Sequence, residues 1–243
     1  MIIDVLVNGA NGRMGQATVQ ALLANPKFRI VGQTGRQDQL AQTIKATKAK
    51  VVIDFTAPQS AFDNTLIILN SGAHPVIGTS GMTLEQIGDL QKKAEALKRG
   101  GIIAPNFSLG AMLMMKYAKE IARYLPHVEI IEMHHDRKLD SPSGTALRTA
   151  EVIAEAHLEA AHQPQQEIVA GSRGANYKGI PIHAIRLPGL LAHQQIIFGE
   201  TGGTLTLRHD SISRESFMAG VLMASEKVMG MKRLVYGLEN ILV

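Results

Sequence analysis

The stretch EMHHDRKLDSPSGTA, residues 132–146, concentrates side chains that carry protons or hold anions. The adjacent histidines His134 and His135 are followed by Lys138, and the triplet Ser143-Gly144-Thr145 lies a few residues further on. Histidine changes its charge near pH 6.5, and a lysine that is desolvated or lies beside another cation can titrate close to neutrality. These residue types suit proton transfer to a bound substrate.

The triplet Ser143-Gly144-Thr145 stands where a helical pattern begins, and this pattern runs to about His162. A helix start presents unpaired backbone N–H groups, and the two hydroxyls of the triplet add further donors for a carboxylate. The stretch therefore predicts a general acid, His134 or Lys138, beside a pocket for a carboxylate at Ser143, Gly144 and Thr145.

Two alternatives to this interpretation stay open. Two histidines could bind zinc, but adjacent side chains of a strand point to opposite faces, and the chain has neither a cysteine nor a His-Glu-x-x-His motif. The residues could also have plain structural roles. Ser143 or Thr145 would then be an N-cap, the histidines half-buried residues at a strand end, and Lys138 a solvated charge.

A glycine-rich turn lies near the start of the chain. The apolar run at 2–7 leads into NGANGRMG, and a helical pattern follows that ends at Asn25-Pro26. Glycines in such a turn let the backbone approach a pyrophosphate, and the helix start faces the anion. A tight turn without a ligand is the alternative, but the position after a first strand favours a dinucleotide site made of Gly9, Ala10, Asn11, Gly12, Arg13 and Met14.

The end of the second predicted strand decides which dinucleotide binds. An acid about 20 residues beyond the glycines marks NAD, whereas this chain has Thr34-Gly35-Arg36 there. Arg36 can pair with a 2′-phosphate and Thr34 can donate to it, which favours NADPH. Arg36 could instead be a solvated loop charge, and Asp38 leaves some use of NADH open.

The elements that position these residues alternate through the first half of the chain. Short apolar strands are predicted at 2–7, 28–34, 50–56, 75–80 and 101–108, and helices between them include 57–70 and 83–98. This order is typical of a parallel sheet, whose ligand lies outside the carboxyl ends of the strands. Residues at two of these ends are expected to border the nicotinamide: Gly78, Thr79, Ser80, Pro105, Asn106, Phe107 and Ser108.

The second half departs from this alternation near residue 108. After a helix at 109–125, a strand at 128–136 and the helix that starts near Ser143, strand-like runs follow one another at 166–172, 179–189, 194–200 and 204–210. The predicted fold class is α/β, with a Rossmann-like nucleotide domain and an α+β substrate and oligomerisation domain with a mixed sheet. The expected domains are 1–108 with 214–243, and 109–213.

Composition narrows the function classes. The 243 residues are 45% hydrophobic and 19% charged, with a net charge of +4, 4% aromatic residues and no cysteine. Scattered basic residues and few aromatics argue against a nucleic-acid partner, and the apolar runs are shorter than the roughly 18 residues that span a membrane. We expect a chain without a signal peptide in the cytoplasm, because a chain without cysteine forms no disulfides and suits a reducing compartment.

Five motifs resemble those of the dihydrodipicolinate reductase family: GANGRMG, VVIDFT, GTSGMT, APNFSLG and EIIEMHHDRKLDSPSGTA. The last is the most specific, and the resemblance covers the whole chain. It implies a reductase on the diaminopimelate route to lysine that passes a hydride from NAD(P)H to a cyclic dicarboxylate imine and forms tetrahydrodipicolinate. It also implies a homotetramer joined through the sheets of the second domain.

The resemblance assigns roles to single residues. The proton-donor positions fall on His134 and Lys138, the substrate-binding histidine on His135, and the carboxylate-binding pair on Gly144 and Thr145. The cofactor positions fall on three segments: Gly9 to Met14, Gly78 to Ser80 and Pro105 to Ser108. Two departures are Gly35, where many members have an acid, and Ser80, where a threonine is common.

Three further expectations concern mechanism and rival functions. Hydride delivery to a conjugated ring carbon is expected to be followed by protonation of a neighbouring carbon. Arg214 is a candidate hinge or cofactor contact. An NADPH-sensing regulator would need only the glycine turn, and a metal hydrolase only the histidines, whereas this chain carries both sets.

Overall fold

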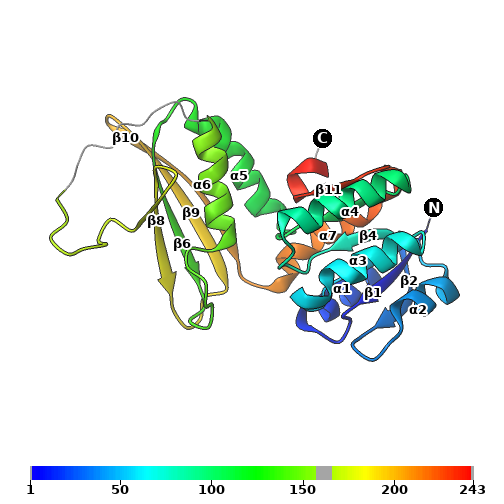
Figure 1. The fold of residues 1–243 in the computed structure, drawn as a ribbon. Coiled ribbons are helices and arrows are strands. Elements are labelled where there is room, and N and C mark those ends of the chain that lie inside the picture. The colour runs from blue at the N-terminus through cyan, green and yellow to red at the C-terminus, as the bar shows by residue number, and fades with distance from the viewer. Residues whose placement is uncertain (1, 157–165, 242–243) are drawn as a thin grey trace. The chain divides into compact units, whose positions relative to one another are not determined.

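The computed structural model describes residues 2–156 and 166–241. Its contacts divide the chain into two compact units, which are Met1–Leu109 with Arg214–Val243 and Gly110–Ser213. The predicted boundary placed Leu109 in the second domain, one residue away from this division. Figure 1 shows a helix-flanked sheet in each unit. Within the described ranges, every helix is too short or too polar to cross a membrane.

Unit 1 is built on a six-stranded sheet in the order β11-β5-β4-β3-β1-β2, and all its pairings are parallel. The central strands are short runs of β-branched residues buried on both faces, as the sequence VVI of β3 illustrates. The strands are β1 (Ile3–Asn8), β2 (Phe28–Thr34), β3 (Val51–Asp54), β4 (His74–Ile77), β5 (Gly101–Ile103) and β11 (Leu234–Tyr236).

Helices of unit 1 connect these strands and cover the sheet (Figure 1). The start of α4 shows how the sequence fixes an element, since Thr83 accepts from the backbone of Gln86 while the Gln86 side chain accepts from Thr83 N. The helices are α1 (Arg13–Leu23), α2 (Leu40–Thr47), α3 (Ala61–Asn70), α4 (Leu84–Ala96) and α7 (Met218–Lys227), with short 3-10 turns at Pro58–Ser60, Arg214–Phe217, Val228–Gly230 and Leu238–Ile241.

Unit 2 contains a mixed five-stranded sheet in the order β10-β9-β6-β8-β7. Helices α5 (Leu109–Ala122) and α6 (Gly144–Ala156) supply buried residues to the same core as alternate residues of the strands, such as Val128 and Ile130. The strands are β6 (His127–His134), β7 (Ala175–Tyr177), β8 (Ile180–Arg186), β9 (Ala192–Glu200) and β10 (Gly203–Ser211). The predicted fold class is confirmed: a Rossmann-like parallel sheet and a second, mixed sheet.

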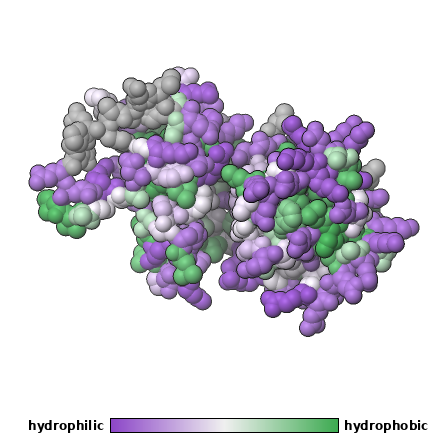
Figure 2. Space-filling view, viewed as in Figure 1, coloured by the Kyte–Doolittle hydropathy of each residue, from purple (hydrophilic) through white to green (hydrophobic). Residues whose placement is uncertain are grey.

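One predicted strand is wrong. Residues 166–172 form a turn, because the Glu167 carboxylate accepts hydrogen bonds from the backbone N–H groups of Gly171 and Arg173, both at 2.9 Å. Ile168 is 96% exposed, so the apolar residues of this run face solvent instead of a core, and Figure 2 shows them as hydrophobic surface at the end of a loop. The predicted extension of α6 to about His162 lies outside the described residues beyond Ala156.

Candidate active site

The glycine turn between β1 and α1 leaves no room for side chains at two positions. Gly9 has a φ of 82°, and a Cβ there would lie 2.3 Å from the carbonyl oxygen of Phe55. A Cβ at Gly15 would lie 2.1 Å from the Gly9 carbonyl oxygen, so α1 can pack on the turn only with glycine. Gly12, the N-cap of α1, brings no capping side chain, and the first turn of α1 contains no acid. The helix start therefore fits a bound anion such as a pyrophosphate.

A buried carboxylate, Asp54, joins the carboxyl ends of the strands beside this turn. Asp54 is 0% exposed and ends β3, which pairs with β1 where the strand order of the sheet reverses, so that Asp54 lies opposite Asn8. Such a switch point is where open α/β sheets bind ligands. The carboxylate accepts from neutral donors: Asn8 Nδ2 at 2.7 Å, Asn64 Nδ2 at 2.9 Å, Thr79 Oγ1 at 2.7 Å, and Thr56 through Oγ1 at 2.8 Å and N at 3.2 Å.

This network changes the role of Thr34. The Thr34 side chain is only 3% exposed, and its hydroxyl donates to Asn8 Oδ1 at 2.8 Å. The expectation that Thr34 donates to a 2′-phosphate is therefore wrong. Arg36 lies on the exposed turn that follows β2, where the Asp38 carboxylate accepts from Gly35 N at 2.7 Å. Arg36 remains the side chain suited to a phosphate on this turn.

Each of the two segments expected to border the nicotinamide contains both buried and accessible residues. The Thr79 hydroxyl is taken by Asp54, and Phe107 is buried with its ring 6.1 Å from that of Phe55 in an edge-on contact. A Cβ at Gly78 would lie 2.0 Å from the Phe55 ring, so glycine is required there. Ser108 is also buried, whereas Ser80, Pro105 and Asn106 reach the surface at least in part.

In unit 2, His134 ends β6 and is held by a buried carboxylate. Its Nδ1 lies 2.6 Å from Oε2 of Glu132, whose side chain is 0% exposed. The two residues stand two positions apart on one strand, and their side chains therefore share a face of the sheet. This spacing was present in the sequence, but the role of Glu132 was not predicted from it.

Glu132 also binds Arg186 from the neighbouring strand β8, whose register places Arg186 opposite His134. Arg186 donates through Nη1 to Oε2 at 2.8 Å and through Nη2 to Oε1 at 2.7 Å, and Ser143 N donates to Oε1 at 3.1 Å. Burial raises the pKa of Glu132, but hydrogen bonds from His134 and Arg186 outweigh it and lower this pKa to about 2. Glu132 is therefore ionised at neutral pH.

Lys138 forms an ion pair within its own loop. Its Nζ lies 2.7 Å from both carboxylate oxygens of Asp140, and this contact lowers the pKa of Asp140. The Lys138 side chain is largely buried, whereas that of Asp140 is exposed. Arg186 Nη2 donates to the Asp140 carbonyl oxygen at 2.8 Å, so the cation that binds Glu132 also holds the loop of Lys138.

The predicted carboxylate pocket divides into a cap and two accessible positions. Ser143 is buried, and its hydroxyl accepts from Ala146 N at 3.2 Å, which makes it the N-cap that the structural alternative described. Its hydroxyl is therefore used within α6. Gly144 is exposed and a Cβ there would meet nothing within 4 Å, while Thr145 and His135 are half-buried. Gly144 and Thr145 are thus the residues of the triplet that reach the surface at the start of α6.

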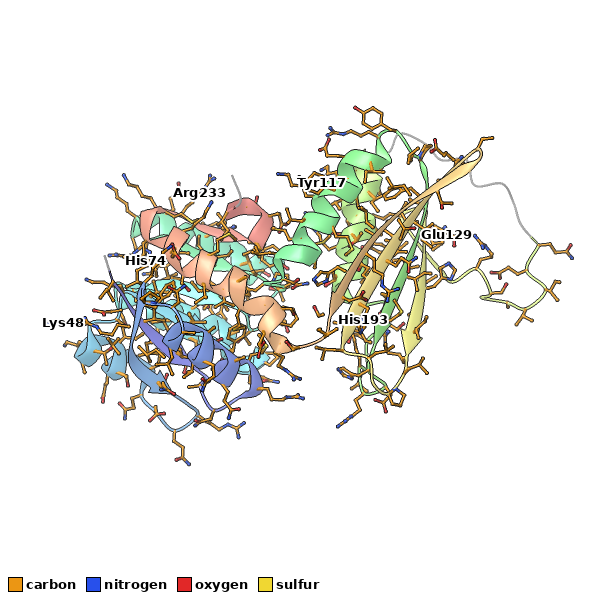
Figure 3. The ribbon with its side chains drawn as sticks, turned by 180° about the vertical axis from the view of Figure 1, so that it is seen from behind. Lys48, His74, Tyr117, Glu129, His193 and Arg233 are labelled. Atoms are coloured by element: carbon orange, nitrogen blue, oxygen red, sulfur yellow. The ribbon has the colours of Figure 1, made fainter. Side chains whose placement is uncertain are left out.

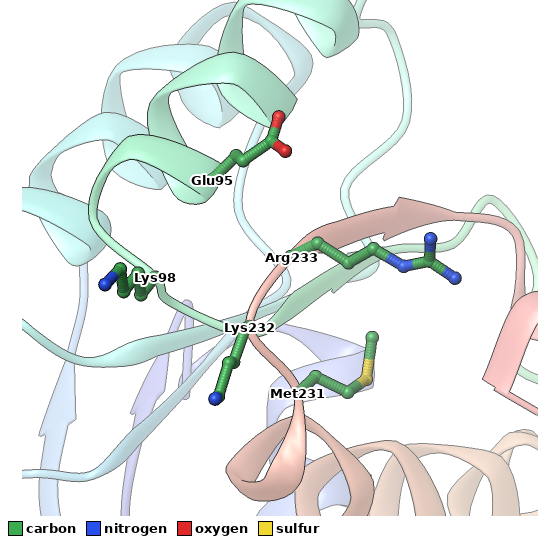
Figure 4. A pocket seen from close by; sticks show the side chains of 5 residues that line it. All are labelled: Glu95, Lys98, Met231, Lys232 and Arg233. Carbon is green, nitrogen blue, oxygen red and sulfur yellow. The ribbon is translucent and has the colours of Figure 1, made fainter.

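A pocket in unit 1 lies away from the glycine turn. A pocket of about 540 Å³ is lined by Glu95, Lys98, Met231, Lys232 and Arg233 (Figure 4). Glu95 and Lys98 come before β5 in the chain, and the other three residues come directly before β11. The pocket therefore lies at the amino ends of these strands, the edge of the sheet opposite the glycine turn. Among the described residues, no three His, Asp or Glu side chains are grouped so that they could hold a metal ion.

A parallel sheet with a glycine turn at its switch point, together with a second unit that carries a histidine and a lysine beside a helix start, defines the class of two-domain dinucleotide-dependent oxidoreductases. Two family models match the chain: "Dihydrodipicolinate reductase, N-terminus" over residues 3–107 and "Dihydrodipicolinate reductase, C-terminus" over residues 110–242. The chain belongs to the dihydrodipicolinate reductase family.

Curated relatives and solved structures agree with this assignment. A 4-hydroxy-tetrahydrodipicolinate reductase of Coxiella burnetii (strain Dugway 5J108-111) is 55% identical over 242 residues and 100% of both chains. One from Legionella pneumophila (strain Paris) is 50% identical over 98% of both. A dipicolinate-bound dihydrodipicolinate reductase from Paenisporosarcina sp. TG-14 superimposes with a TM-score of 0.91, at 45% identity and full coverage of both chains.

More distant structures share only the fold. An amine dehydrogenase from Mycobacterium smegmatis covers 96% of this chain and is itself covered to 94%, with a TM-score of 0.68 at 12% identity.

Proposed function

We propose that the chain reduces 4-hydroxy-tetrahydrodipicolinate to tetrahydrodipicolinate in lysine and diaminopimelate biosynthesis, with NADPH as the preferred donor. Family membership makes it an oxidoreductase that uses a nicotinamide cofactor. The observation that carries the proposal is the cluster at the end of β6. There, Glu132 holds His134 and also binds the start of α6, the element that begins with Gly144 and Thr145.

The residues of unit 2 would act on the substrate. Loss of the 4-hydroxyl group as water would leave a ring double bond conjugated with the imine, and the bound nicotinamide would supply a hydride to a carbon of this conjugated system. His134, Lys138 or both would then protonate the neighbouring carbon. Thr145 and the N–H groups at Gly144 would hold a substrate carboxylate with the help of the helix dipole, and His135 would contact the substrate beside them. The Lys138–Asp140 pair supports this assignment, because a substrate carboxylate could replace Asp140 as the partner of Lys138.

The residues of unit 1 would hold the cofactor. The turn from Gly9 to Met14 would bind the pyrophosphate, and the segments Gly78 to Ser80 and Pro105 to Ser108 would border the nicotinamide. Arg36 would pair with the 2′-phosphate of NADPH, and this preference is supported by the absence of an acid at Gly35. NADH use is reduced in this account but not abolished, since the remaining contacts are common to both cofactors.

The open face of the sheet in unit 2 supports a homotetramer. Residues 129, 131 and 133 of β6 alternate with the core residues, and their register partners on β9 lie on the same face. Ile131, Met133 and Ile197 are half-buried apolar residues of this face, which also carries Glu129 and His193 (Figure 3). A second copy that covers this face would complete their burial. A cytoplasmic location is part of the proposal and suits a chain without cysteine.

The proposal is tested by NADPH oxidation in a coupled assay in which the substrate is made from pyruvate and aspartate semialdehyde. We expect oxidation that depends on both precursors and is insensitive to chelators. NADPH binding without oxidation would instead identify a sensor, and loss of activity with a chelator would identify a metal enzyme.

A further inference from the structure

We propose that Glu132 is a positioning residue, which fixes the ring of His134 so that Nε2 faces the substrate. This inference rests on the proposed role of His134 as a proton donor. Glu132 is fully buried and lies 2.6 Å from Nδ1 of His134. It does not touch the reacting atoms in this account and acts only through the histidine.

The direction of the hydrogen bond follows from the charge state of Glu132. An ionised carboxylate only accepts hydrogen bonds, so Nδ1 of His134 must carry the proton of this contact. Arg186 donates to both oxygens of Glu132 and keeps the carboxylate ionised. Since Nδ1 is used in this way, Nε2 is the ring nitrogen that remains for the substrate, and the tautomer of the neutral ring is fixed.

Both oxygens of Glu132 are fully used, which makes the carboxylate rigid. Oε2 accepts from His134 and from Nη1 of Arg186, while Oε1 accepts from Nη2 of Arg186 and from the backbone N–H of Ser143. These four bonds match the four acceptor sites of a carboxylate. A rotation of Glu132 would break its bonds to β8 and to the start of α6 together. Glu132 therefore fixes the position of His134 relative to the helix proposed to bind the substrate.

A purely structural ion pair is the competing explanation, and it makes a different prediction. Buried ion pairs can often be replaced by neutral side chains of similar size without loss of stability, whereas removal of one partner leaves a buried charge. The single substitution Glu132→Gln is therefore ambiguous, because it strands Arg186. The double substitution Glu132→Gln with Arg186→Met removes both charges and restores the balance.

We expect the double variant to melt close to the wild type and to bind NADPH normally, but to lose turnover roughly 10- to 100-fold through misplacement of His134. The Michaelis constant for the substrate should change less than kcat. Adding the same pair to His134→Gln should produce little further loss, because the positioned group is already absent. A matched control is Lys119→Met with Glu155→Gln, an exposed ion pair between α5 and α6 that should leave kcat unchanged.

Near-normal turnover of the double variant, together with a large loss in His134→Gln, would overturn the inference and leave the proposed function standing. Near-normal turnover of His134→Gln would instead overturn the premise that His134 donates a proton, and the inference with it, and would leave Lys138 as the proton donor of the proposed function. A second measurement applies to the unmodified enzyme if the double variant does not fold. The ¹⁵N shifts of His134, recorded where its ring is neutral, should show a protonated Nδ1, and a protonated Nε2 would overturn the inference.

Discussion

Among the described residues, each unit buries one carboxylate at or near the carboxyl end of a strand, and the two carboxylates have hydrogen-bond partners of different charge. Asp54 in unit 1 and Glu132 in unit 2 are both 0% exposed. Asp54 accepts hydrogen bonds from amides, hydroxyls and a backbone N–H. Glu132 instead binds the guanidinium of Arg186 and the imidazole of His134.

The difference between the two carboxylates matches the tasks proposed for the two units. The hydrogen bonds between Asp54 and its neutral donors fix the loops at the switch point. None of these donors has to gain or lose a proton beside the cofactor. The charged cluster around Glu132 holds a histidine that is proposed to move a proton, and Arg186 compensates the carboxylate during that step. In this account one buried carboxylate acts as a scaffold, and the other positions the proposed proton donor.

The largest expected effect lies at the proton-handling residues. His134→Gln or Lys138→Met should reduce turnover about 100- to 10,000-fold, because each removes a positioned acid while the apolar core stays intact. The double substitution should cost less than the product of the two single losses if they act as one unit. Turnover, melting temperature and NADPH affinity would be measured together. Collapse of the melting temperature would instead favour a structural role for these residues.

Removal of the Asp54 carboxylate should lower the stability of the protein more than its turnover. Asp54→Ala leaves Asn8, Asn64 and Thr79 without their acceptor, and we expect a loss of roughly 3 kcal/mol or more in the free energy of unfolding. Asp54→Asn retains one acceptor oxygen and should lose less. Chemical denaturation would measure both, and kcat at saturating NADPH should stay close to that of the wild type. An Asp54→Ala variant as stable as the wild type would contradict the scaffold role.

The charged cluster around Glu132 predicts that the stability of the protein depends on pH. The pKa of Glu132 is lowered from 4.5 to about 2 in the folded protein. Its contribution is therefore fully present above about pH 4.5 and is lost as the pH falls toward 2. The shift corresponds to a contribution on the order of 3 kcal/mol. The double variant Glu132→Gln with Arg186→Met should show a weaker acid destabilisation, and an unchanged acid profile would argue against the assigned ion pair.

Arg36 in unit 1 is expected to distinguish NADPH from NADH. Arg36→Ala should weaken NADPH binding by about tenfold or more, since a charge-assisted contact contributes roughly 1.5–3 kcal/mol. NADH lacks the 2′-phosphate, so its affinity should hardly change. Titration with both cofactors measures the difference directly. Equal losses would show that Arg36 supports the turn and does not read the phosphate.

Features that depend on local pattern were predictable from the sequence. The alternation of strands and helices predicted the parallel sheet, and the run of consecutive strand-like segments predicted a mixed sheet in the second half. The position of NGANGRMG after the first strand predicted a glycine turn that leads into a helix, and the structure has no space for side chains at Gly9 and Gly15 of this turn. The stretch 132–146 predicted proton carriers and a helix start within one segment, because all of them lie close together in the chain.

Features that depend on pairing between distant segments were not predictable. Arg186 reaches Glu132 only because β8 pairs with β6 in a register that no local pattern fixes. The hydroxyl of Thr34 turns toward Asn8 for the same reason, since β1 and β2 place these residues opposite each other. β7 and β11 have three residues each, too few to show a period. Residues 166–172 have the sequence pattern of a strand, but they form a turn because the Glu167 carboxylate accepts a hydrogen bond from the backbone N–H of Gly171.

The central claim is that unit 1 binds the cofactor while unit 2 binds and protonates the substrate. Its most direct test is calorimetric titration of Arg36→Ala and Thr145→Val with NADPH and with dipicolinate, the dicarboxylate in the Paenisporosarcina structure. Thr145→Val keeps the shape of the side chain and deletes only its hydroxyl. The account predicts that Arg36→Ala weakens NADPH binding alone, and that Thr145→Val weakens dipicolinate binding by several-fold, about the contribution of one hydrogen bond, without affecting NADPH. Loss of NADPH affinity in Thr145→Val with normal dipicolinate binding would contradict it.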